Sequence, residues 1–169
     1  MKKLCDSFLI VCLITLSNSL NAQTNLLSAL PETKTQFVQS EPQVINTINW
    51  LESTPMDSAE VKRKEQLALL LAWMTNSPTV DIVVNTKVVN FSEKNPELLL
   101  IFMGGWTKYV LENSYSKDLV KSNLAGVLSV IKVYKKNKTL KKDKNLEKLI
   151  ELNEKNELEE WIIMQANKK

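Results

Sequence analysis

Apolar residues recur at helical spacing in several separate segments of this chain, with polar or proline-containing stretches between them. Side chains three or four positions apart share one face of an α-helix, so each stripe predicts a helix that buries one side. Asn153 and Asn156 interrupt the last stripe, which leaves open whether that segment forms one helix or two. The predicted helices span residues 42–53, 58–76, 95–113, 116–136 and 143–165.

Residues 79–91 are ambiguous, because they are rich in β-branched residues that favour a strand by propensity. No second run of this kind is present to pair with them, and a lone strand leaves its backbone groups unpaired. We therefore expect a short helix here, with a strand as the alternative. The chain as a whole predicts an all-α fold, a single multihelical bundle of about five to six helices with an antiparallel helical hairpin over residues 95–136 at its centre.

Local signals indicate where these helices begin. Pro42 suits a first helical turn, because its missing N–H would have no partner there in any case. Asp57 and Glu60 form a capping-box pattern before the second predicted helix. Asn95 and Ser116 are the expected N-caps of the two hairpin helices.

The first 22 residues have the layout of a secretory signal peptide, with Lys2 and Lys3 before a short apolar core and small or polar residues after it. The apolar core is too short to span a bilayer. We expect cleavage near Ala22 and export of the mature protein to the periplasm or the extracellular space. The expected organisation is a signal peptide over residues 1–22, a flexible mature N-terminal lead-in over residues 23–41 and a single all-α domain over residues 42–169.

Composition argues against many kinds of catalytic and metal site. The chain contains no histidine, and its two cysteines, Cys5 and Cys12, both lie in the expected signal peptide. Zinc sites and the nucleophile–base pairs of serine and cysteine hydrolases depend on these residue types, so we expect no catalytic residue, no metal and no cofactor. Arg63 is the sole arginine. Because bidentate phosphate recognition usually uses arginine, we expect no nucleic-acid partner.

Two short patterns around the hairpin turn could still carry catalysis without histidine. Ser114 and Lys117 match the S-x-x-K pattern of penicillin-binding enzymes, but the companion motifs are missing. Glu112 and Asp118 flank the same turn and could form a carboxylate pair of the kind that hydrolyses sugars. Nothing in the pattern buries these carboxylates, so a helix-capping turn is the expected structure here.

All three glycines lie inside predicted helices, where each costs about 1 kcal/mol relative to alanine. Gly105 and Gly126 stand at similar distances, roughly 15 Å, from the hairpin turn. We therefore expect them to face each other where the two helices cross, with a Cα separation within about 10 Å. The alternative is that Gly104 and Gly105 kink their helix and open a ligand groove beside Trp106.

A basic stretch follows the hairpin, and a run of glutamates follows at once. Such a stretch can attract an anionic surface, whereas alternating charges more often form a solvated loop and helix face. We expect the solvated face, because the adjacent glutamates would repel the same anionic surface. The lysines concerned are Lys132, Lys135, Lys136, Lys138, Lys141 and Lys142.

These observations favour an exported helical protein that binds another protein or serves a structural or accessory role, without catalysis. One alternative is a carrier of a small apolar ligand near Gly104, Gly105 and Trp106. Another is a carboxylate-dependent hydrolase acting on an extracellular or cell-wall polymer. No membrane-spanning segment is expected in the mature chain, because the apolar run over residues 98–106 is far shorter than the ~20 residues that a spanning helix needs.

Overall fold

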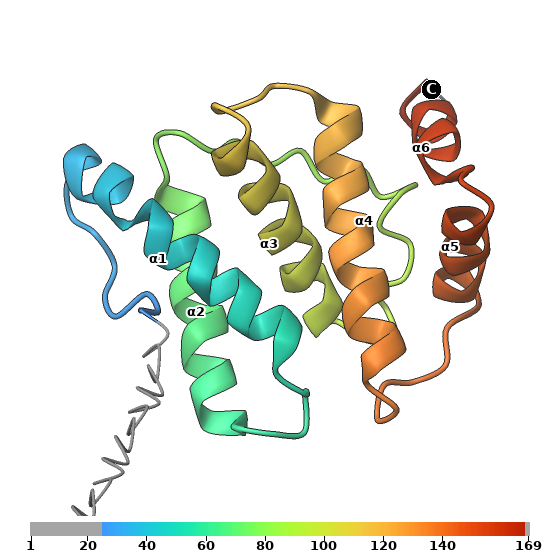
Figure 1. Cartoon of the computed structure of the whole chain (residues 1–169), viewed down its shortest axis with the longest axis horizontal. Coiled ribbons are helices and arrows are strands. Elements are labelled where there is room, and N and C mark those ends of the chain that lie inside the picture. The colour runs from blue at the N-terminus through green and yellow to red at the C-terminus, as the bar shows by residue number, and fades with distance from the viewer. Residues whose placement is uncertain (1–24, 168–169) are drawn as a thin grey trace, which may run out of the picture.

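The computed structural model describes residues 25–167, so the expected signal peptide and its cleavage point at Ala22 lie outside the described residues. Within residues 25–167 the regular structure consists of six helices and no strand, which confirms the predicted all-α bundle (Figure 1). No helix in this described range is long and apolar enough to cross a membrane. The helices are α1 (Lys34–Ser53), α2 (Glu60–Asn76), α3 (Glu97–Glu112), α4 (Leu119–Lys136), α5 (Lys144–Glu154) and α6 (Leu158–Asn167).

The antiparallel pair of α3 and α4 stands at the centre of the bundle, as the sequence predicts (Figure 1). The extensive packing of these two helices against each other joins the two halves of the molecule. On one side α1 and α2 cover α3, and on the other side α5 and α6 cover α4. The C-terminal half of α1 also reaches α4, so the bundle brings three helices together at the hairpin.

The first helix begins at Lys34, and the expectation of a flexible lead-in up to residue 41 is wrong. Thr33 and Gln36 form a capping box, in which the Thr33 side chain accepts from the Gln36 N–H and the Gln36 side chain accepts from the Thr33 N–H. Pro42 therefore lies inside the helix and not in its first turn. The segment before the helix is also anchored, because the backbone N–H of the buried Leu27 donates to Thr47 Oγ1 at 2.9 Å.

Two of the expected N-caps of the next helices are also wrong. Ala59 precedes α2 in a left-handed conformation with φ of 50°, and no side chain caps this helix. Asp57 therefore does not complete the expected capping box. Before α3, the side chain of Asn95 bridges to the loop that precedes α5. Its Nδ2 donates to the Lys141 carbonyl at 2.9 Å, and its Oδ1 accepts from the Lys141 N–H at 3.0 Å.

The cap of α4 lies two residues after the expected Ser116. Asp118 is the N-cap, and its carboxylate accepts from the Lys121 N–H at 3.0 Å. Ser116 Oγ in turn accepts from the Asp118 N–H at 3.2 Å, so the serine shapes the turn before the helix. The aspartate also places a negative charge at the positive end of α4, which stabilises the helix start.

Residues 79–91 form neither the expected short helix nor a strand. They run as an irregular strap with turns, and apolar side chains such as Val88 and Phe91 are fully buried under it. Side chains from other elements pair with the backbone of the strap. Trp106 Nε1 donates to the Asp81 carbonyl at 3.2 Å, and the Asn145 side chain donates to the Asn90 carbonyl at 2.8 Å.

The last predicted segment is broken into α5 and α6, which resolves the alternative left open by the sequence. Asn156 adopts a left-handed conformation with φ of 59° between the two helices. Asparagine tolerates this conformation better than most residues other than glycine. The break allows both short helices to turn back onto α4.

Candidate functional site

Two of the three glycines allow the backbones of α3 and α4 to approach closely. A Cβ atom built on Gly105 would stand 2.8 Å from the Ala125 carbonyl oxygen and 2.7 Å from Ser129 Cβ. A Cβ atom on Gly126 would stand 2.8 Å from the Phe102 carbonyl oxygen. Because both helices present backbone at these points, a side chain at either glycine would push them apart.

The third glycine and the neighbouring tryptophan lie in the core. A Cβ atom on Gly104 would make ordinary contacts, at 3.5 Å from Ile48 and 3.8 Å from Leu70. Trp106 is 1% exposed and packs against Phe102 with ring centroids 6.1 Å apart. Gly104 therefore faces α1 and α2, whereas Gly105 and Gly126 each face the opposing helix of the hairpin.

A groove of about 270 Å³ lies over Gly105, where α1, α3 and α4 meet. Its floor is low because Gly105 has no side chain and Ala125 has only a methyl group. Leu128 is 39% exposed and contributes an apolar wall. The residues that line the groove are Glu52, Gly105, Lys108, Tyr109, Glu112, Ala125, Leu128, Ser129 and Lys132.

Glu52 is a buried acid at this groove, with only 4% of the residue exposed. Its Oε1 accepts from Ser129 Oγ at 2.7 Å, and its Oε2 accepts from Lys132 Nζ at 2.7 Å. The Lys132 side chain is 58% exposed, so the carboxylate is neutralised by a cation that reaches it from the surface. Lys108, from α3, donates instead to the neutral Asn49 Oδ1 at 2.6 Å.

Sequence reasoning missed Glu52, although its spacing from apolar residues of the same helix indicates that it is buried. Glu52 lies four residues after Ile48 and eight after Val44, and both of these side chains are buried in α1. An acid on the apolar stripe of a helix must find partners in the interior, because an unpaired buried charge is costly. The partners come from α4, far away in the sequence, so the stripe could indicate the burial of Glu52 but not its ion pair.

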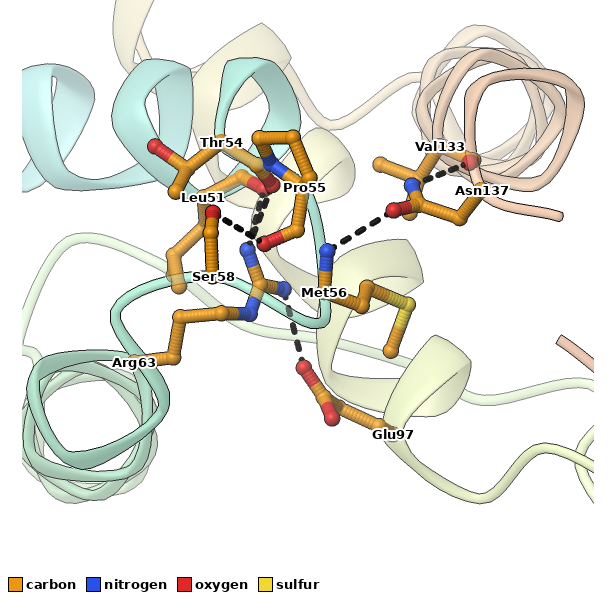
Figure 2. Close-up of polar contacts among 9 residues, drawn as sticks. All are labelled: Leu51, Thr54, Pro55, Met56, Ser58, Arg63, Glu97, Val133 and Asn137. Atoms are coloured by element: carbon orange, nitrogen blue, oxygen red, sulfur yellow. Dashed lines mark hydrogen bonds and ion pairs between the residues drawn. The ribbon is translucent and has the colours of Figure 1, made fainter. Parts of the chain in front are cut away.

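A second polar cluster braces the same end of α1, as Figure 2 shows. The Arg63 guanidinium from α2 donates to the carbonyls of Leu51 at 3.0 Å and Thr54 at 2.9 Å, and to Glu97 at 2.9 Å. The Arg63 side chain is 3% exposed. The guanidinium therefore ties the C-terminal end of α1 to the N-terminal end of α3, and its role is structural.

The end of α4 holds the loop between α1 and α2 in a related way (Figure 2). Asn137 Oδ1 accepts from the Met56 N–H at 2.7 Å, and its Nδ2 donates to the Val133 carbonyl at 2.7 Å. Lys136, the residue before Asn137, also donates through its Nζ to the Ser53 carbonyl. The segment that carries Glu52 is thus fixed by α2 and by α4.

The basic stretch singled out by the sequence is divided between these contacts and the surface. Lys132 pairs with Glu52, and Lys135 pairs with Glu154 at 2.9 Å. Lys136 is engaged by a backbone carbonyl. The remaining three expected residues, Lys138, Lys141 and Lys142, are exposed in the loop before α5.

The catalytic patterns near the hairpin turn do not converge on a cleft. Ser114 and Tyr115 both have positive φ, at 53° and 58°, in the turn itself. Asp118 is committed to capping α4, whereas Glu112 lines the groove and is exposed. Within residues 25–167 no group of three or more acidic, histidine or cysteine side chains is placed to hold a metal ion.

The groove therefore combines a small-residue floor, an apolar wall and charged side chains of both signs. Such a combination suits the recognition of a ligand or partner group that is itself partly apolar and partly charged. Its one buried acid already has a hydroxyl donor and a cation. No protein family, curated protein or solved structure matches this chain.

Proposed function

We propose that this protein is an exported, non-catalytic helical domain that binds another protein, and that the groove over Gly105 is its contact surface. The groove itself carries the proposal. It combines the exposed apolar side chain of Leu128 and the partly buried aromatic ring of Tyr109 with charged side chains at its rim. Protein interfaces commonly have this arrangement of an apolar or aromatic centre and a polar rim.

Binding is favoured over catalysis by the surroundings of the groove's acids. A general acid or base must come within hydrogen-bond reach of the proton that it transfers. Glu52 is held by Ser129 and Lys132, and Glu112 is exposed to solvent. The hydrolase alternative needs Glu112 and Asp118 to act together, although Asp118 is committed to capping α4. Glu112→Gln would then abolish cleavage of a wall polymer, and this result would replace the binding proposal.

The apolar-carrier alternative has less support than protein binding. A groove of about 270 Å³ lies at the small end of ligand sites, which typically measure about 300–1,000 Å³. The expected aromatic wall, Trp106, is buried in the core and does not line this groove. An apolar ligand in this groove would therefore lack the contact with Trp106 on which the carrier alternative depends.

Hydrogen–deuterium exchange tests the proposed contact surface. Proteins crosslinked to the mature chain in its own compartment would be purified and added back to the free chain. We expect protection in residues 105–112 and 125–132. Leu128→Glu should abolish this protection, whereas Val61→Glu, at a 73% exposed apolar position on α2, should preserve it. Protection on another face, no protection with any partner, or equal binding by the two variants would overturn the proposal.

Export is the other part of this proposal, and it rests on the pattern of residues 1–22. The N-terminal residue of the protein recovered from periplasmic and culture fractions tests it. We expect the chain in these fractions to begin near Gln23. A full-length chain confined to the cytosolic fraction would refute export and leave the groove proposal standing.

A further inference from the structure

We propose that the groove binds a primary ammonium group, such as the side chain of a lysine on the partner, at the carboxylate of Glu52. The inference rests on the proposed binding function and specifies its chemistry. Glu52 makes two polar contacts, one to each oxygen. The oxygen that Lys132 contacts can accept instead from another ammonium group that enters the groove and takes the place of Lys132.

The present counter-ion of Glu52 is exchangeable. Lys132 reaches the carboxylate with a side chain that is 58% exposed, so water can solvate its ammonium as soon as it swings away. Ser129 is itself buried and would keep its hydrogen bond to the other oxygen. A ligand ammonium in the same position would keep the buried carboxylate neutralised, and this avoids the cost of an unpaired buried charge.

The shape of the groove suits an ammonium on an apolar stem. A lysine side chain lays its methylene groups along apolar surface while its charge finds a polar partner. The floor at Gly105 and Ala125 and the wall at Leu128 provide such a surface beside Glu52. A Cβ atom on Gly105 would clash with Ser129 Oγ, so only glycine leaves the Ser129–Glu52 contact intact.

An anionic ligand is the rival, because Lys108 and Lys132 also line the groove. Such a ligand would bring a like charge next to Glu52 and would have to draw Lys132 away from it. The two occupants make opposite predictions for Lys132. For an ammonium ligand this lysine is a competitor, and for an anion it is a binding residue.

The test is a titration of the full mature chain, followed by NMR or calorimetry, with a short Gly–Lys–Gly peptide blocked at both ends. The control peptide carries an acetylated lysine. We expect the free-lysine peptide to perturb residues 105–112 and 125–132, and to bind about tenfold more tightly than the acetylated one, the scale of one charge-assisted contact. Lys132→Met should tighten binding of the free-lysine peptide. The control is Lys135→Met, which removes the next lysine of α4; that lysine pairs with the exposed Glu154, so its loss should not change binding.

Glu52→Gln should abolish the preference for free lysine, and the comparison of the two peptides on the unmodified chain keeps the test decisive if that variant does not fold. Equal binding of the two peptides, no binding, or weaker binding by Lys132→Met would overturn the inference. If a partner protects the groove and is sensitive to Leu128→Glu while the lysine peptide fails, only the ammonium inference is wrong. If the peptide binds but no partner protects the groove, only the protein-binding proposal is wrong.

Discussion

Replacing each glycine by alanine in turn measures how closely α3 and α4 pack. Alanine in a helix interior is favoured over glycine by about 1 kcal/mol, so this gain is common to all three variants. The variants differ only in what the new methyl group meets. At Gly104 the methyl group would lie 3.5 Å or more from Ile48 and Leu70, which is ordinary van der Waals contact. We therefore expect Gly104→Ala to stabilise the protein by up to about 1 kcal/mol.

At Gly126 the methyl group would stand 2.6 Å from the Phe102 ring and 2.8 Å from its carbonyl oxygen. Phe102 is fully buried and the carbonyl belongs to α3, so relief requires the two helices to separate. Such overpacking costs about 1–3 kcal/mol, which outweighs the propensity gain. We expect a net loss of up to about 2 kcal/mol for Gly126→Ala. Gly105→Ala should lose at least as much, because it also displaces the Ser129 hydroxyl from Glu52.

Urea unfolding followed by tryptophan fluorescence and circular dichroism gives the free energies of unfolding for this comparison. A difference of 1 kcal/mol corresponds to about 2–4 °C in melting temperature for a protein of this size. The free energy of unfolding should be highest for Gly104→Ala, lower for the unmodified protein, and lowest for Gly126→Ala and Gly105→Ala. If Gly126→Ala and Gly105→Ala prove as stable as Gly104→Ala, the helices do not approach closely at the glycines and the reasoning fails.

Three further predictions concern local features of the fold. Ala59→Gly should stabilise the protein by about 1 kcal/mol, because φ of 50° is strained for alanine. The control Ala68→Gly, at an exposed position within α2, should destabilise the protein by a similar amount. Thermal melts compare the two variants. Asn95→Ala should cost about 1–3 kcal/mol in urea unfolding, because it leaves both backbone groups of Lys141 without their partner. Burial raises the pKa of Tyr134 above its usual value of 10.0, so the unfolded chain loses this proton first and stability falls as pH rises through the folded-state pKa. Tyr134→Phe should therefore show a smaller loss of stability above about pH 10 in the same assay, and an unchanged pH profile would contradict this assignment.

The central hairpin could be predicted from the sequence because its information is local. Long apolar stripes and a short polar turn define the positions of α3 and α4 to within a few residues. The break between α5 and α6 was likewise visible at Asn153 and Asn156. In contrast, Pro42 does not indicate the start of α1, because the capping box of Thr33 and Gln36 begins the helix earlier and Pro42 lies inside it.

The strap over residues 79–91 could not be predicted in the same way. Its apolar residues have no period, because the strap follows the surface of the hairpin and not an axis of its own. Its backbone groups find partners such as Trp106 and Asn145, which only the folded chain brings near. The groove could not be predicted from the sequence for the same reason. Glu52, Gly105 and Ser129 come from three helices, and no short stretch of sequence contains them together.

The single arginine offers a last test of how the fold prepares the groove. Arg63 does not line the groove, yet it holds the carbonyl of Leu51, the residue next to Glu52. A lysine ammonium cannot reproduce the fork by which the guanidinium joins α1 to Glu97, so we expect Arg63→Lys to cost about 1–3 kcal/mol in urea unfolding. Lys64→Gln, which breaks an exposed pair with Glu60, should change stability little. If the position of Glu52 depends on this brace, Arg63→Lys should also weaken binding of the lysine peptide while the chain remains folded. Unchanged affinity would mean that α4 alone, through Ser129 and Lys132, positions the carboxylate.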